Sequence, residues 1–444
     1  MFLPATLLAF YAAPARWRVG VLVAASLIFY GVSGTFVLAA FLFSIAWGFS
    51  TAFLFGRIPK GWAIAISIVG PFFFLVMFKY LNFILDTAHA GAQTRDLFEA
   101  FLSITLPAGI SFYTFELVSY SIDVADGRTP RETKLLRFAG FATFFPHLIA
   151  GPIMRYHDLR DQLAALGENA KLQPNIVGGL KFLAIGIFAK VFVADLSGIA
   201  VEQAQAVSLG ERTALDQSVQ IAFWSMQIYY DFWAYSIMAI GLGRLFCIEL
   251  PVNFREPYMS ENPREFWRRW HVTLSYWLRD YAYIKLGGNK AYVRNIIIVF
   301  AAVGLWHGAG WNFVAWGLYH AALVVGYHFA APLWDRLPRV LTVTLTFVLV
   351  SLGWPLFFLS FSEYAAFLAH FASAPAGLNV YSWVSIAYLA ALLGFTFLAR
   401  ERYWLHNDRE HPNAIADSPY VVAALAFVGL VSLSLSKTFI YFRF

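Results

Sequence analysis

Long apolar runs alternate with short polar segments along the whole chain. About 20 apolar residues in a helix cross a bilayer. Runs of that order lie at 17–33, 36–56, 61–83, 135–154, 176–196, 218–246, 293–308, 311–331, 339–361, 381–399 and 419–435. A shorter run lies at 2–13 and an interrupted one at 99–120. The pattern therefore predicts an all-α polytopic membrane protein with about 11 or 12 membrane segments.

The composition also favours a membrane protein over a soluble one. Only 13% of the residues are charged, whereas soluble domains carry roughly 25%. The apolar run at 2–13 follows no basic segment and precedes Arg16 and Arg18, so it is predicted to be a helix rather than a secretion signal. Cys247 is the single cysteine of the sequence, which excludes an internal disulfide.

The basic residues are distributed as the positive-inside rule expects. The net charge is +6, and nine basic residues lie between Arg244 and Arg294. Basic loops stay on the cytoplasmic side of a membrane. This segment is therefore predicted to be cytoplasmic, and the positive charge is explained without a nucleic-acid partner.

The densest polar cluster lies in "FWRRWHVTLSYWLRDYAYIKLGGN", residues 266–289. At about 100° per residue, a helix through this stretch has one polar stripe. The stripe consists of Arg264, Arg268, His271, Ser275 and Arg279. One interpretation is a helix that lies on lipid headgroups. The other is the wall of a polar entrance whose arginines bind a phosphorylated substrate, with a neutral His271 that can accept a proton.

Two further histidines lie in apolar surroundings in "GLWHGAGWNFVAWGLYH". His320 lies in the middle of the run at 311–331, on one face with Trp316, and Gly317 beside it leaves room for a substrate. Ionisable groups at mid-membrane usually face the protein interior or a cavity. A neutral, hydrogen-bonded structural histidine is the alternative. His307 lies at a helix end, where it can also serve as a cap or an anchor.

Asp231 in "YYDFWAYSIM" is another ionisable group inside an apolar run. An unpaired carboxylate in hydrocarbon is costly, so an arginine of the stripe or tyrosine hydroxyls are its expected partners. It either orients a catalytic group or braces the bundle. His147 adjoins a Gly-Pro break, which predicts a kinked or re-entrant segment with a structural histidine.

Several sequence blocks occur in an order that resembles the membrane-bound O-acyltransferase family. They are "FPHLIAGPIMR", "YYDFWAYSIMAIGLGRLF", "LPVNFREPYMS", "EFWRRWHVTLSYWLRDYAYIKLGGN" and "GLWHGAGWNFVAWGLYH", within residues 107–328. The chain is most similar to the bacterial branch that contains the alginate O-acetylation membrane protein. The resemblance implies a single domain over 1–444, a ring of helices around a central pore, and an essential histidine at His320. His271 takes the second polar position of the family.

The resemblance also implies a function. Members of the family move an acyl group from a cytosolic thioester to a hydroxyl, so acetyl-CoA or another acyl thioester is the expected donor, and no tightly bound cofactor or metal is expected. The expected acceptor is a cell-envelope or secreted polysaccharide, reached through a periplasmic SGNH-type partner from the bacterial inner membrane. Expected substrate contacts are Arg264, Arg268, Arg279, Asp231, Trp316 and His307. D-alanyl transfer to teichoic acid and a transporter or channel are the alternatives.

Overall fold

The computed structural model describes residues 1–89, 91–102, 106–168, 172, 174–398, 418–432 and 437. The regular secondary structure of the described residues is helical, with no β-strand and only a single bridge between Phe55 and Ile58. Five helical segments among them are long and apolar enough to cross a membrane. These are Thr35–Leu54, Lys60–Thr87, Ile176–Gln205, Trp311–Trp334 and Arg339–Phe357. The predicted class, an all-α multi-pass membrane protein, is confirmed.

The chain forms two compact units. The first comprises Met1–Leu180 and Ala239–Pro251, and the second comprises Lys181–Met238 and Val252–Phe444. The helices α12 and α14 contribute residues to both units.

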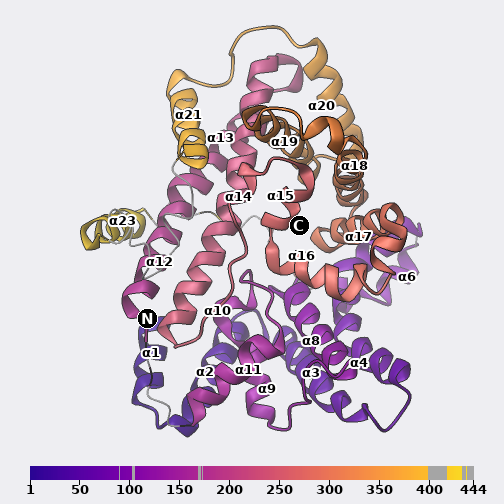
Figure 1. Cartoon of the computed structure of the whole chain (residues 1–444), viewed down its shortest axis with the longest axis vertical. Helices are drawn as coiled ribbons and strands as arrows, with labels where there is room; N and C mark the ends of the chain where they lie inside the picture. The colour runs from indigo at the N-terminus through magenta and orange to yellow at the C-terminus, as the bar shows by residue number, and fades with distance from the viewer. Residues whose placement is uncertain are drawn as a thin grey trace. The chain divides into compact units, whose positions relative to one another are not determined.

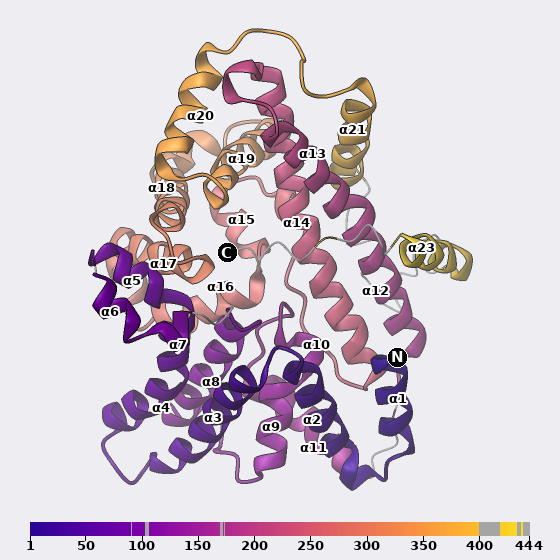
Figure 2. The same cartoon turned by 180° about the vertical axis from the view of Figure 1, so that it is seen from behind.

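The first unit holds the N-terminal helices, drawn from indigo to magenta in Figure 1. They are α1 (Phe2–Ala12), α2 (Ala15–Gly31), α3 (Thr35–Thr51), α4 (Lys60–Leu75), α5 (Leu81–Thr87), α6 (Ala92–Asp96), α7 (Glu99–Leu102), α8 (Ile110–Ala125), α9 (Leu135–Thr143), α10 (Phe145–Leu148) and α11 (Tyr156–Gly167). Within this unit α2 packs against α9 and α11, and α4 packs against α3 and α8. Figure 2 shows the same neighbours from behind.

The second unit holds most of the remaining helices. They are α12 (Ile176–Phe188), α13 (Leu196–Gln205), α14 (Ala214–Leu245), α15 (Pro263–Arg269), α16 (Val272–Leu278), α17 (Tyr292–His307), α18 (Trp311–Trp334), α19 (Arg339–Gly353), α20 (Phe361–Ser373), α21 (Trp383–Leu398) and α23 (Pro419–Val431). A π-helical turn at Ala189–Asp195 connects α12 to α13. Such turns are frequent at functional sites.

One predicted membrane segment is wrong. The run at 135–154 does not form a single helix, because α9 ends at Thr143 and the short α10 ends at Leu148. A Cβ at Gly151 would lie 2.3 Å from the Cα atom of His147, so the chain turns tightly on itself here, as the Gly-Pro break predicted. Residues 103–105, 399 and 433–435 of three other predicted segments lie outside the described residues.

The closest helix pair of the second unit is α17 and α18, which lie side by side in Figures 1 and 2. A Cβ at Gly317 would lie 2.1 Å from the carbonyl oxygen of Phe300, and one at Gly304 would lie 2.1 Å from that of Phe313. Small residues let helix backbones approach in this way. The expectation that Gly317 leaves room for a substrate is therefore wrong, because this glycine faces α17.

Gly317→Ala should force α17 and α18 apart. Overpacking of this kind costs about 1–3 kcal/mol, so the thermal unfolding midpoint of the protein in detergent should fall. Gly326→Ala on the same helix is the matched control, because a Cβ there has no atom within 4 Å. An equal midpoint for the two variants would show that the glycine contact does not hold the pair together.

Candidate active site

The chain breaks at His271, between α15 and α16. His271 has φ 43° and ψ 58°, in the left-handed region, which a residue other than glycine rarely adopts. Asn253 holds the break: its carbonyl accepts from the amide of Val272 at 2.8 Å, and its side-chain oxygen accepts from the Thr273 hydroxyl at 2.6 Å. The predicted continuous amphipathic helix through Arg264 and Arg279 is therefore wrong.

The residues of the predicted stripe nevertheless surround one cavity of about 270 Å³. The two helices turn their polar sides to it, and α17 and α18 complete its wall. Its polar lining consists of Arg264, Arg268, His271, Ser275, Arg279, Tyr283, Asn289, Tyr292 and His307. We call it the arginine cavity. Arg268 is exposed, whereas His271 and His307 are 1% and 4% exposed. The cavity therefore leads from exposed cations to buried imidazoles.

The three arginines of this cavity differ in their partners. Arg279 is paired with Asp280 at 2.6 Å. The guanidinium of Arg264 lies 5.2 Å from the ring centre of Tyr327 and contacts His328 at 3.3 Å. Arg268 makes no hydrogen bond or ion pair within the described part of the chain. It is therefore the arginine with the most donors available to an anionic ligand.

His271 is neutral because it is buried. Removal from water lowers the pKa of its imidazole to about 3, since burial penalises the charged form of a histidine. The ring lies 4.7 Å from that of Phe232 and 5.7 Å from that of Trp306. The sequence predicted this neutral state, and burial is its cause.

His320 lies on α18 inside a shell of aromatic rings. Its side chain is completely buried. The shell consists of Phe266, Trp267, Trp316, Tyr319 and Trp354, with ring centres 4.8–6.4 Å from the imidazole. Neither ring nitrogen of His320 has a hydrogen-bond partner among the described residues. The alternative of a hydrogen-bonded structural histidine is thus wrong for this conformation.

Trp267 and Trp316 lie between the arginine cavity and His320. Trp267 lines the cavity and meets the imidazole edge to face at 5.1 Å. Trp316 lies 4.9 Å from the cavity residue His307 and 4.8 Å from His320. The structure thus brings His271, His307, Trp316 and His320 into one region, although His320 itself does not line the cavity.

Asp231 does not line the arginine cavity and belongs to a buried ionic cluster. Lys190, in the π-helical turn, contacts Asp231 at 2.9 Å and Asp195 at 2.5 Å. All three side chains are at most 6% exposed. The sequence predicted an arginine of the stripe or tyrosine hydroxyls as partners of Asp231 and did not identify Lys190. Lys190 lies inside an apolar run, which is the signal that would have found it.

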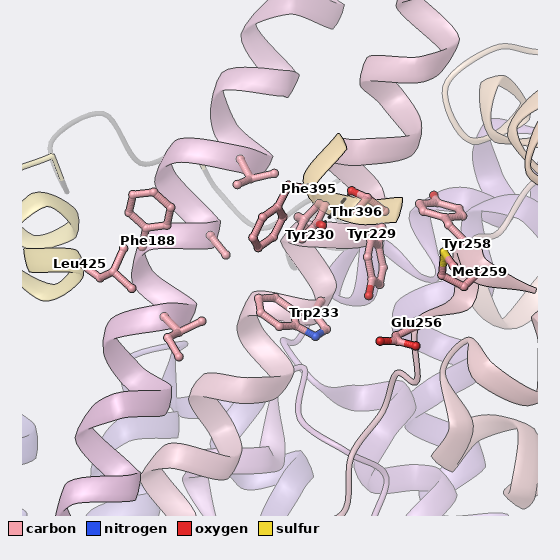
Figure 3. A pocket seen from close by; sticks show the side chains of 13 residues that line it. Phe188, Tyr229, Tyr230, Trp233, Glu256, Tyr258, Met259, Phe395, Thr396 and Leu425 are labelled. Atoms are coloured by element: carbon pink, nitrogen blue, oxygen red, sulfur yellow. Dashed lines mark hydrogen bonds between the residues drawn. The ribbon is translucent and has the colours of Figure 1, made fainter. Parts of the chain in front are cut away.

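A second cavity of the same unit is smaller and mostly apolar (Figure 3). Its volume is about 100 Å³. Tyr229, Trp233 and Glu256 provide polar atoms, and the rest of the wall is largely aliphatic and aromatic. The indole nitrogen of Trp233 has no hydrogen-bond partner within the described ranges. The only charged residue that lines this cavity is acidic, so it does not suit a phosphorylated ligand.

His147 lies in the first unit, in contact with Glu116 at 3.2 Å. Both side chains are 1% exposed, and Glu116 also accepts from the amide of Met154 at 2.9 Å. These bonds hold the segment after α10, in keeping with the structural role expected for this histidine.

The comparisons with known proteins agree with the resemblance in the sequence. The sequence model of the membrane-bound O-acyltransferase family matches residues 60–337. A probable alginate O-acetylase, AlgI, from Pseudomonas syringae pv. tomato is 37% identical, over 80% of this chain and 70% of that protein. A peptidoglycan O-acetyltransferase from Helicobacter pylori is 32% identical, over 76% and 70%. A teichoic acid D-alanyltransferase from Bacillus subtilis is 29% identical, over 56% and 68%.

The chain therefore belongs to the membrane-bound O-acyltransferase family. It is an integral membrane O-acyltransferase that uses an acyl donor. The matched residues include Lys190 of the π-helical turn and His320. They also include the shell residues Phe266, Trp267 and Trp316.

Lys190→Met should destabilise the protein. The change leaves two carboxylates buried without their ammonium partner, and breaking a buried pair costs about 3–5 kcal/mol. Adding Asp231→Asn should restore part of the folded yield, measured by size-exclusion chromatography in detergent. Lys60→Met is the control, because Lys60 forms an exposed pair with Asp126. If Lys190→Met folds normally and loses only activity, Asp231 orients a catalytic group instead.

Proposed function

We propose that this protein moves an acetyl group from a cytosolic thioester across the membrane for O-acetylation of a cell-envelope or secreted polysaccharide. The support is twofold. Relatives that are 32–38% identical are named alginate O-acetylase or peptidoglycan O-acetyltransferase. The second unit also combines an arginine-lined cavity with a buried histidine of the kind that acyl transfer to a hydroxyl requires.

The donor in this proposal is acetyl-CoA, bound in the arginine cavity. Guanidinium groups bind phosphate oxygens through paired hydrogen bonds, and Arg268 at the exposed end is available for them. The thioester end then points toward His271 and His307 at the buried end. Both histidines are buried, and this apolar end of the cavity suits a neutral acyl group better than a phosphate. The acidic second cavity is not the donor site.

His320 acts in this proposal as the general base. The hydroxyl oxygen of the acceptor attacks the thioester carbonyl carbon, a C–O bond forms and the C–S bond breaks. The hydroxyl proton passes to a ring nitrogen of His320 and from there to the departing thiolate. A base positioned for such a proton transfer contributes about 10²–10⁴-fold to the rate. The dry aromatic shell keeps water from competing as the acceptor.

The acceptor side completes the proposal. The protein lies in the bacterial inner membrane, with the basic segment between Arg244 and Arg294 in the cytoplasm. A periplasmic SGNH-type acyltransferase partner passes the acetyl group to the polysaccharide. We also propose that residues 1–444 are one acyltransferase domain, because the family match at 60–337 includes residues of both compact units.

D-alanyl transfer to teichoic acid is less well supported, because the relatives with that name match a smaller share of the chain. Incorporation of radiolabelled acetyl or D-alanyl groups into isolated envelopes separates the two. Acetyl incorporation from acetyl-CoA supports the proposal. Incorporation of D-alanine alone overturns it, and transport of an intact solute without acylation would indicate the transporter alternative.

His320→Ala should abolish acetylation while the protein stays inserted at normal abundance. His320→Gln should also be inactive, because an amide fills most of the site but cannot take a proton near neutral pH. The expected loss is about 10²–10⁴-fold in the rate of acetyl incorporation. His157→Gln, at a half-exposed histidine of the first unit, should leave the rate unchanged. Substantial acetylation by His320→Ala would end the assignment of His320 as the base.

Arg268→Ala should weaken donor binding. A charge-assisted hydrogen bond contributes about 1.5–3 kcal/mol, so the KM for acetyl-CoA should rise roughly 10- to 150-fold with a smaller change in kcat. Titration of the donor at low salt gives both constants. Arg255→Ala, at an exposed arginine outside the cavity, is the control. An unchanged KM for Arg268→Ala would mean that phosphate is bound elsewhere.

A further inference from the structure

The closed shell around His320 conflicts with its proposed task. The imidazole has no exposed surface, and proton transfer requires a partner within about 3 Å. A side chain of the shell must therefore leave before a thioester and a hydroxyl can reach the ring.

Trp267 differs from the other four shell residues because it lines the arginine cavity, whereas Phe266, Trp316, Tyr319 and Trp354 do not. Trp267 and Tyr319 are partly exposed, while the other three are at most 1% exposed. The Tyr319 hydroxyl is held by a hydrogen bond that it donates to the carbonyl of Leu349 at 2.6 Å.

No hydrogen bond holds the indole of Trp267 in the closed position. Its nitrogen has no hydrogen-bond partner among the described residues. The ring is retained by edge-to-face contacts with Phe300 at 5.0 Å, Phe266 at 5.4 Å and Trp316 at 5.7 Å, as well as with His320. Aromatic contacts of this kind contribute about 0.5–1.5 kcal/mol each, so rotation of the ring into the cavity is accessible once a ligand replaces them.

The backbone that carries Trp267 is fixed at both ends. Before it, the Asn262 side chain accepts from the amide of Glu265 at 2.9 Å and caps α15. After it, the Ser275 hydroxyl donates to the carbonyl of Trp267 itself at 2.9 Å. The side chain can therefore rotate without movement of the helix.

We propose that Trp267 is the gate between the arginine cavity and His320, and that its indole, once rotated into the cavity, selects a short acyl group. This inference rests on the proposed function for the identity of the donor. The gate opens when the acyl end of the donor takes the place of the indole. An acetyl group passes beside the rotated indole, whereas a longer chain meets the ring.

The gate can be tested without any acceptor by chemical modification of His320. Diethyl pyrocarbonate reacts with neutral imidazole nitrogens, and peptide mass spectrometry gives the modification rate at each histidine. Trp267→Ala should raise the rate at His320 at least tenfold over the parent protein. The rate at His307, which already lines the cavity, should not change.

Trp354→Ala distinguishes a gate from a general loosening of the shell. This residue also packs on His320, at 5.9 Å, but does not line the cavity. A gate predicts much faster modification in Trp267→Ala than in Trp354→Ala. Equal rates in these two variants, or no acceleration in Trp267→Ala, would overturn the proposal. Trp267→Phe, with a smaller ring, should give an intermediate modification rate at His320. It replaces the alanine variant in this test if that variant does not fold.

Acyl selectivity tests the second half of the proposal. The parent protein should prefer acetyl-CoA to butyryl-CoA, and Trp267→Ala should raise the ratio of kcat/KM for butyryl to acetyl transfer at least tenfold. Trp383→Ala, at an exposed tryptophan, should leave the ratio unchanged. A uniform loss with both donors would indicate a structural role and refute the selection. If the parent protein transfers no acetyl group, the proposed function fails, and the modification rates still decide whether Trp267 is a gate.

Discussion

A histidine without a hydrogen bond, enclosed by aromatic rings, is the constraint on which the second unit depends. Leaving a buried polar group unpaired costs about 1–3 kcal/mol, and both nitrogens of His320 are in this position. The packing around His320 must offset that cost. The close approach of α17 and α18 at Gly304 and Gly317 provides this packing, because it brings the large side chains of α18 into contact with their neighbours. The site is therefore maintained by the helix contact rather than by its own polar bonds.

Two groups of charged residues in this unit lie in different surroundings. Lys190, Asp195 and Asp231 neutralise one another in a buried cluster, as charged groups in apolar surroundings must. Arg268 and Arg279 are exposed at the outer end of the cavity, where water solvates them until an anion arrives. This separation lets an apolar unit hold a cationic entrance without burying an unpaired cation, and it places the hydrated charges where a phosphorylated donor arrives.

The sequence predicted the helices well at the long apolar runs 218–246 and 311–331. It failed at 135–154, where local Gly and Pro residues outweigh the apolar pattern. It also failed at His271, because the left-handed turn depends on bonds to Asn253, a residue distant in the chain. The stripe residues still meet, since α15 and α16 face the same cavity on both sides of the turn.

Trp267 could not be assigned from the sequence for a related reason. Helical periodicity divides the residues of this stretch into a polar and an apolar face. Trp267 lies between the two faces, so the pattern assigns it to neither. Only the packing shows that its ring contacts His320 on one side and the cavity on the other. The same turn at His271 separates Trp267 from the aromatic residues of α16 and leaves its ring at the boundary between the two environments. The turn at His271, which conflicts with the helical pattern of the sequence, thus leaves Trp267 between the arginine cavity and His320.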